Sequence, residues 1–230
     1  MARPRPAPSA RPSPRPAPAR GRGSRAGAGE GAARFVEPVT LVGRYATLEP
    51  LARRHAAALA AAAADGELWR LWYTSVPAPA ATAAWIDAAL AMRENLGAMP
   101  FVIRDNASGE IVGSTRYFNV EAPHRRLEIG HTWHARRVQR TAINTECKLL
   151  LLTHAFEALS CIAVEFRTSF FNFQSRAAIA RLGAKQDGIL RNHQVTPDGT
   201  LRDTVVFSII AGEWPAVKRH LAYQLERPRC

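Results

Sequence analysis

The sequence predicts an α/β protein in which helices flank one sheet, and three observations in its 230 residues predict this class. A β-hairpin is expected where Phe101–Arg104 and Ile111–Phe118 flank the turn-forming residues 105–109. Residues 126–133 are expected to form a strand that leads directly into a helix, whose apolar residues recur at helical spacing. Hydrophobic residues make up 47% of the chain, which suits one domain with a substantial core.

Helix propensity, capping residues and breakers predict the other elements. A first strand is expected at 39–48, and the alanine-dense segment 51–64 has high helix propensity. Thr82 is expected to cap the next helix, which runs to about residue 96. The later elements are expected to be a helix at 143–159, a strand at 162–167, a helix at 175–182 ended by Gly183, a strand at 205–210 and a helix at 214–225 with Pro215 in its first turn.

The first 34 residues differ from the rest in composition. They are rich in Arg, Pro, Ala and Gly, and their eight Arg and one Glu give +7 of the formal net charge of +12, which leaves +5 for residues 35–230. Because this segment has almost nothing to bury, we expect residues 1–34 to be disordered and 35–230 to form the domain. The tail is interpreted either as a solvated extension, or a start codon assigned too early, or as an arm that touches RNA or another polyanion.

The cysteines and the hydropathy favour a cytoplasmic protein. Cys147, Cys161 and Cys230 are odd in number and lack metal-like spacing, which argues for a reducing compartment and against a disulfide framework. The sequence therefore predicts no metal site. No apolar run reaches 18 residues, so no transmembrane helix and no membrane partner are expected.

A strand that opens into a helix start predicts a phosphate site. The strand is Leu127-Glu-Ile-Gly-His-Thr-Trp133, and the helix start follows Gln139-Arg-Thr-Ala-Ile-Asn144. The first N–H groups of a helix have no partner within the helix, and the helix dipole attracts anions to them. A cofactor that bears phosphate, met by main-chain donors, is expected at this point.

These two segments and a third one resemble the GCN5-related N-acetyltransferases (GNAT), in particular the branch of ribosomal-protein N-terminal acetyltransferases of the RimJ and RimL kind. That family's loop has the pattern Gln/Arg-x-x-Gly-x-Gly/Ala. Gln139 matches it, whereas Ala142 and Asn144 replace the two small positions. Asn172-x-x-Ser175, followed by Leu182-Gly183-Ala184, matches a later helix of the family. The resemblance covers residues 38 to 226.

The resemblance implies a GNAT fold, with a mixed, mostly antiparallel twisted sheet whose central strands splay apart around acetyl-CoA. It implies direct transfer of the acetyl group to a primary amine, either a protein N-terminus or a small molecule. Related enzymes are often dimers, so the resemblance makes a homodimer possible and leaves the oligomeric state open. The alternative is a protein of the same fold that binds CoA weakly and serves as an interaction module, because Ala142 and Asn144 depart from the loop pattern.

The family's cofactor contacts carry over to the loop, to the end of the strand before it and to one later helix. They are expected at Trp133, His134, Gln139, Arg140, Thr141, Ala142, Ile143, Asn144, Thr145 and Asn172. Asn172 would hydrogen-bond the pantetheine amide or cap its helix, and the two roles are compatible. Arg136 or Arg137 would reach the 3′-phosphate, or belong to a solvated basic face.

Two residues are expected to be catalytic. Glu128 is the candidate general base, directly or through a water, with an ion pair to Arg126 or Arg116 as the structural alternative. By the two-residue period of a strand, residues 128, 130, 132 and 134 would share one face, and His131, an alternative base, would lie on the other. Ser175, one turn after Asn172, would sit near the sulfur and could protonate the leaving thiolate, although a thiol is already a fair leaving group. Many family members use a tyrosine further along this helix, where this sequence has Ile179.

The acceptor site is expected between the first two helices and a late hairpin. Trp69, Trp72, Tyr73 and Trp85 either line an aromatic pocket there or belong to the core.

Overall fold

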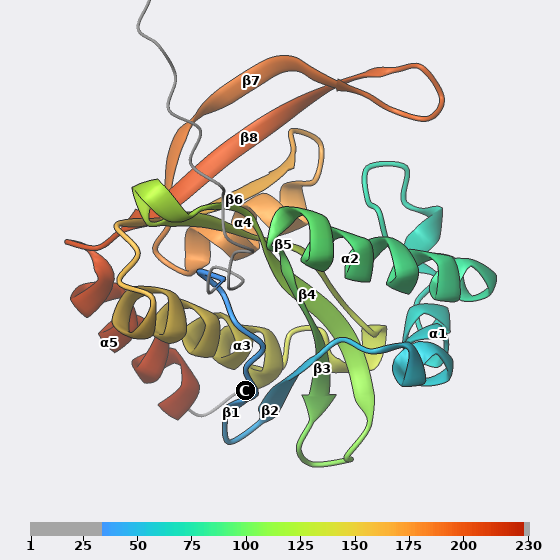
Figure 1. Ribbon diagram of the computed structural model, residues 1–230, viewed down its shortest axis with the longest axis horizontal. Coiled ribbons are helices and arrows are strands. Elements are labelled where there is room, and N and C mark those ends of the chain that lie inside the picture. The colour runs from blue at the N-terminus through green and yellow to red at the C-terminus, as the bar shows by residue number, and fades with distance from the viewer. Residues whose placement is uncertain (1–33, 228–230) are drawn as a thin grey trace, which may run out of the picture. The chain divides into compact units, whose positions relative to one another are not determined.

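The computed structural model describes residues 34–227, which form one eight-stranded sheet flanked by helices (Figure 1). The strands are β1 (Leu41–Val42), β2 (Ala46–Pro50), β3 (Met99–Asp105), β4 (Ile111–Glu121), β5 (Arg126–His134), β6 (Ala163–Ser169), β7 (Lys185–Val195) and β8 (Leu201–Ile210). The helices are α1 (Ala56–Ala64), α2 (Thr82–Leu96), α3 (Ala142–Thr153), α4 (Phe173–Arg181) and α5 (Trp214–Glu226).

The sheet is mixed and mostly antiparallel, as expected. Its order is β1-β2-β3-β4-β5-β6-β8-β7, and β5–β6 is its parallel pair. In Figure 1, α1 and α2 lie to the right of the strands, and α3 and α5 lie to the left. Each pair of helices buries apolar side chains. Leu59 of α1 and Ile86 of α2 are buried on one side, and Leu151 of α3 and Leu221 of α5 are buried on the other.

Strands β5 and β6 separate soon after they begin. They pair over 126–128 and 163–165, while β5 continues to His134 and β6 to Ser169. The ends of both strands therefore have main-chain groups that do not pair with the neighbouring strand. This divergence opens the sheet at its centre and positions the candidate site.

The predicted strand at 39–48 is two short strands joined by a tight turn. The carboxylate of Glu146 on α3 accepts hydrogen bonds from the N–H groups of Arg44 (2.8 Å), Tyr45 (2.5 Å) and Ala46 (2.7 Å). A residue about 100 positions away thus holds the turn, and no local pattern in 39–48 announces it.

Two other predictions needed correction. Thr82 is the first residue of α2 and its hydroxyl donates to the carbonyl of Ala78, so it does not cap the helix. The helix predicted at 143–159 is α-helical to Thr153 and continues as a π-helical turn at His154–Ala158. Strand β7, which was not delimited from the sequence, is an edge strand that is exposed along almost its whole length.

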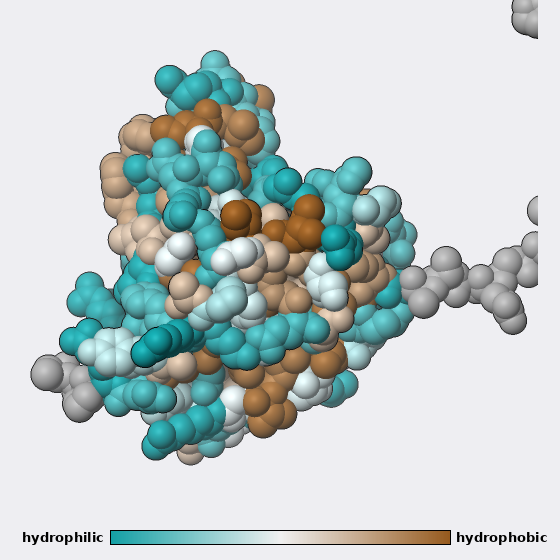
Figure 2. All heavy atoms as spheres, turned by 90° about the vertical axis from the view of Figure 1, so that its left-hand side faces the viewer, coloured by the Kyte–Doolittle hydropathy of each residue, from teal (hydrophilic) through white to brown (hydrophobic). Residues whose placement is uncertain are grey.

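The hairpin β7–β8 projects beyond the rest of the sheet. Figure 2 shows it as the upper lobe, with hydrophobic side chains gathered where this lobe meets the body. The predictions for the tail concern residues 1–34, and 1–33 of them lie outside the described residues. Within 34–227, no helix combines the length and apolar character needed to cross a membrane.

Candidate active site

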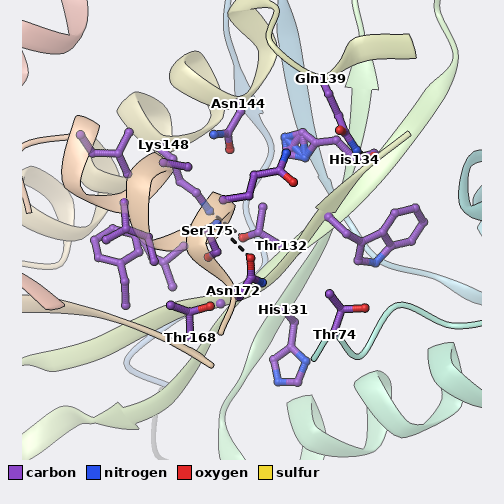
Figure 3. Close-up of a pocket in the computed structure, with 18 of the residues that line it drawn as sticks. Thr74, His131, Thr132, His134, Gln139, Asn144, Lys148, Thr168, Asn172 and Ser175 are labelled. Atoms are coloured by element: carbon purple, nitrogen blue, oxygen red, sulfur yellow. Dashed lines mark hydrogen bonds between the residues drawn. The ribbon is translucent and has the colours of Figure 1, made fainter. Parts of the chain in front are cut away.

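A cavity of about 900 Å³ lies where β5 and β6 separate. Its walls come from β5, β6, the start of α3, the inner side of α4 and the segment 68–76 that precedes α2. Figure 3 shows Gln139, Asn144 and His134 towards one end and His131 and Thr74 towards the other, with Lys148, Thr132 and Ser175 between them. We refer to the first as the loop end and to the second as the acceptor end.

A β-bulge in β5 changes which side chains face each other. Ser114 pairs with Trp133 and Arg116 pairs with Gly130, so His131 and Thr132 together oppose Thr115. His131 has a left-handed backbone, with φ of 50°.

The predicted common face of residues 128, 130, 132 and 134 is therefore wrong. Gly130 and Glu128 lie on the side of Phe118, and His131 contacts the Phe118 ring as well, at 4.8 Å between centroids. Thr132 lies on the opposite side, where its hydroxyl meets Lys148 of α3. The bulge reverses the alternation and brings His131 to the side of Glu128.

Glu128 is buried, and neither ion pair considered from the sequence is formed. Its carboxylate accepts a hydrogen bond from Asn119 at 2.9 Å and lies 3.5 Å from Nε of Arg167, while Arg126 pairs with Glu165 instead. Burial raises the pKa of Glu128 to about 7, although Asn119 and Arg167 lower it. A carboxyl group with this pKa can exchange a proton near neutral pH.

The path from Glu128 to the cavity passes Gly130. Glu128 itself lies next to the cavity rather than in its lining, which includes Gly130. A side chain at Gly130 would come to 2.5 Å from the Phe118 ring and 3.5 Å from Oε1 of Glu128. The absence of a side chain at residue 130 therefore keeps this carboxylate within reach of a substrate, directly or through a water.

The loop before α3 accommodates the residues that replace the family's glycines. The left-handed position is Arg140, with φ of 62°, whereas Ala142 is the first residue of α3. The side chains of Ala142 and Ile143 are buried away from the cavity, while Gln139, Arg140, Thr141, Asn144 and Thr145 line it. The alanine thus occupies a position that does not need glycine's freedom at positive φ.

The start of α3 presents main-chain donors to the loop end. Thr141 is the N-cap, and its hydroxyl accepts from the N–H of Ile143 at 3.3 Å. The other N–H groups of this first turn have no acceptor within the helix. Gln139 fixes the approach to the loop by donating its amide to the carbonyl of His134 at 3.1 Å.

The lining of the cavity is basic throughout. Its charged side chains, within residues 34–227, are Arg140, Lys148, Arg167, Arg181, Arg202 and Arg227, with no Asp or Glu among them. Arg136 and Arg137, expected near the 3′-phosphate, are not part of this lining, and Arg137 pairs with Asp65 and Glu110. Arg181 and Arg227 line the cavity instead.

Lys148 is a charged residue of the cavity wall that the sequence did not single out. Its ammonium is buried in the cavity wall and donates to the hydroxyl of Thr132 at 2.6 Å and to that of Thr115 at 3.4 Å, and burial lowers its pKa to about 8. Among the described residues, no carboxylate forms an ion pair with it. The chain has only three lysines, and the other two, Lys185 and Lys218, form exposed ion pairs. A lysine inside the apolar run Cys147–Leu152 was the available signal.

The helix α4 has Asn172 as its N-cap, as expected, and begins at Phe173, two residues before the predicted start at 175. The side chain of Asn172 caps it by accepting from the N–H of Ser175 at 3.0 Å, and both residues line the cavity (Figure 3). Because the cap uses the amide oxygen of Asn172, its NH₂ group is left to donate to a ligand.

The four predicted aromatic residues lie in different surroundings, and Trp69 is half-buried outside the cavity lining. Tyr73 lines the cavity, and Trp85 packs on Trp133 with 6.2 Å between ring centroids. Trp72 is 61% exposed and contacts Phe171 at 5.6 Å. No aromatic cage formed by all four residues is present in the described part of the chain.

The residues at the loop end fit a ligand that bears phosphate groups. Open N–H groups of α3 and the guanidinium group of Arg140 lie at this end, and Arg181, which also lines the cavity, donates to the Thr145 hydroxyl of α3 at 3.2 Å. Nε2 of His134 is buried without a hydrogen-bond partner in residues 34–227, and burial lowers the pKa of this imidazole to about 4. A neutral histidine and a lining whose charged side chains, within residues 34–227, are all basic suit an elongated, anionic ligand.

The chain belongs to the acetyltransferase (GNAT) domain family, whose model matches residues 46–185. This match confirms the resemblance carried by the loop and by the Asn172–Ser175 helix start. The eight-stranded mixed sheet agrees with solved structures of that family.

Relatives include proteins with ribosomal acetyltransferase names. YdaF of Bacillus subtilis (strain 168), named as a candidate ribosomal N-acetyltransferase, is 30% identical over 110 residues, which cover 48% of this chain and 59% of YdaF. The match thus spans less than two thirds of that relative. A GCN5-related N-acetyltransferase from Brucella melitensis is 30% identical with a TM-score of 0.74, over 83% of this chain and 87% of that one. RimJ of Mycobacterium smegmatis, solved with CoA-disulfide, is 26% identical with a TM-score of 0.68, over 84% and 98%.

Proposed function

We propose that this protein is an N-acetyltransferase that moves the acetyl group of acetyl-CoA directly to a primary amine. The observation that carries the proposal is a single cavity, between the separating ends of β5 and β6, with open helix N–H groups at one end and Glu128 beside the other. A cytoplasmic location and a homodimer remain predictions of the sequence and the resemblance.

The residues at the loop end would hold the cosubstrate. Main-chain N–H groups of Gln139 to Thr145 would bind its pyrophosphate, with charge from Arg140. Asn172 would donate its NH₂ group to the pantetheine arm, which would run beside Trp133 and His134. Lys148 would supply positive charge to the middle of the cavity.

The acceptor end would carry out the proton transfers. Glu128 removes a proton from the acceptor ammonium, and the resulting amine attacks the thioester carbonyl carbon. The C–S bond then breaks, and the second proton lost by the attacking nitrogen passes through the Ser175 hydroxyl to the thiolate, whose conjugate acid has a pKa of about 8.5. His131 is not a competing base, because burial, Arg116 and Arg202 lower its pKa to about 4.

The pKa of Glu128 predicts an acidic limb in the pH profile. Since the carboxylate must be ionised to accept a proton, kcat/KM is expected to fall about tenfold per pH unit below pH 7. Folding raises this pKa from 4.5 to about 7, so the free energy of unfolding is expected to decrease by roughly 3 kcal/mol as the pH rises across that window. Kinetics and urea unfolding at a series of pH values would measure both effects, and both should vanish in Glu128→Gln.

Transfer itself is tested by incubating the full chain with acetyl-CoA and a panel of amines. The panel would combine peptides of varied first residue with small primary amines, and mass spectrometry would detect acetylated products. Product formation that needs Glu128 is the expected result. Binding of CoA without product from any amine would favour the interaction module instead.

A further inference from the structure

Arg202 presents an unsatisfied cation to the acceptor end. It lies on β8, lines the cavity, and its Nε is buried without a hydrogen-bond partner in the described residues. No carboxylate within 34–227 forms an ion pair with it, whereas Arg191 on the same hairpin pairs with Asp203. Arg202 as a whole is half-buried, and a guanidinium whose Nε is buried without a partner is stabilised by an anion that a ligand brings.

The groups around Arg202 do not cancel its charge. It acts electrostatically on both Glu128 and His131, which places these three residues near one another. Arg116 also faces His131; it is 2% exposed, stacks on Trp85 at 5.1 Å and forms no ion pair among the described residues. The carboxylate of Glu128 already lies 3.5 Å from Arg167. Positive charge therefore exceeds negative charge where the amine must arrive, which opposes acceptors that carry further positive charge.

An apolar rim lies beside this end of the cavity. We define the aromatic rim as Trp72, Phe171 and Phe173, which are 61%, 53% and 63% exposed. Leu71 and Tyr73, on either side of Trp72, line the cavity, as does Asn172 between the two phenylalanines. Exposed aromatic rings gathered at the mouth of a site are typical of a surface that a polypeptide covers.

We propose that the acceptor is a polypeptide N-terminus whose first residue is acidic, with its carboxylate bound to Arg202 and the following residues lying on the aromatic rim. This inference rests on the proposed transferase function and selects one acceptor class within it. The α-amine would enter beside Gly130, where Glu128 removes its proton. The charge-assisted bond to Arg202 selects the first side chain, and the rim favours a peptide over a free amino acid.

Matched peptides test the inference in the full chain. Hexapeptide amides that begin with aspartate, asparagine or lysine and are otherwise identical would be compared by the rate of CoA thiol release. The aspartate peptide is expected to exceed its isosteric asparagine partner in kcat/KM by roughly tenfold or more. Free aspartate is expected to react at least about tenfold more slowly than the aspartate peptide, since it cannot cover the rim.

Variants of Arg202 and Arg191, which both lie on the β7–β8 hairpin, test whether Arg202 causes the preference for an acidic first residue. In Arg202→Gln, the kcat/KM of the aspartate peptide should come close to that of the asparagine peptide. Arg202→Glu should favour the lysine peptide. Arg191→Gln should keep the native ratio of kcat/KM between the aspartate and asparagine peptides. Equal rates for the native protein, an unchanged ratio in Arg202→Gln, or equal use of free aspartate would overturn the inference. If acetyl-CoA raises the melting temperature but the aspartate peptide is not acetylated, only the acceptor class is wrong. If acetyl-CoA does not bind, the proposed function fails with it.

Discussion

Glu128→Gln is expected to lower kcat by about 10²- to 10⁴-fold, the range that a positioned general base contributes. The substitution is isosteric, and the glutamine oxygen can still accept the hydrogen bond from Asn119. Acetyl-CoA binding should be unchanged, because Glu128 lies outside the lining of the cavity. Steady-state kinetics with saturating acetyl-CoA would measure the loss.

Glu165→Gln is the matched control for that experiment. Glu165 stands opposite Glu128 in the register of β5 and β6, but its carboxylate is held by Arg126 and Arg167. It should therefore change kcat by less than about tenfold, since it has no proton to transfer. Equal losses in the two variants would show that the carboxylates act only through the shared arginine, and the assignment of Glu128 as base would then be wrong.

Glu146→Ala is expected to give the largest loss of stability, about 3–5 kcal/mol in the free energy of unfolding. The substitution leaves three main-chain N–H groups of the β1–β2 turn without their acceptor. A buried donor without a partner costs roughly 1–3 kcal/mol, which applies in full to Ala46, and the partly buried N–H groups of Arg44 and Tyr45 add smaller costs. Chemical denaturation at neutral pH would measure this change.

A second carboxylate serves as the control for stability. Asp87 on α2 forms an exposed ion pair with Arg53, and such pairs contribute about 0–1 kcal/mol. Asp87→Ala should therefore unfold close to the native protein. A loss of under 1 kcal/mol in Glu146→Ala would mean that water replaces the carboxylate at the turn.

Local patterns predicted most of the fold because the elements follow their periodicity and breakers. The hairpin of β3 and β4, the cap at Asn172, and the helix that starts with Trp214 and Pro215 are all where the sequence places them. Family motifs then supplied the mixed sheet and its splayed centre. Positions that depend on distant partners were not predictable in this way, and Glu146 holding a turn 100 residues earlier is the plainest case.

The sequence predicted many of the residues that line the cavity, but it did not predict which face of β5 each of them occupies. Most of the expected cofactor contacts line one cavity, yet the bulge at His131 moves Thr132 and His134 to the side opposite Glu128. That bulge depends on pairing with β4, which the β5 sequence alone does not specify. The loop pattern directed attention to Ala142, whereas the left-handed residue is Arg140. Lys148 and Arg202 stand out because no carboxylate in residues 34–227 forms an ion pair with either of them, which only the three-dimensional structure reveals.

The most direct test of the central claim is to titrate the full chain with acetyl-CoA and to measure the melting temperature of the protein at each concentration. If the loop before α3 binds pyrophosphate, cosubstrate at about a hundredfold over its dissociation constant stabilises the fold by roughly 2.7 kcal/mol, and the melting temperature rises by several degrees. An unchanged melting temperature at millimolar acetyl-CoA would contradict the account, because the cavity between β5 and β6 would then not be a cosubstrate site.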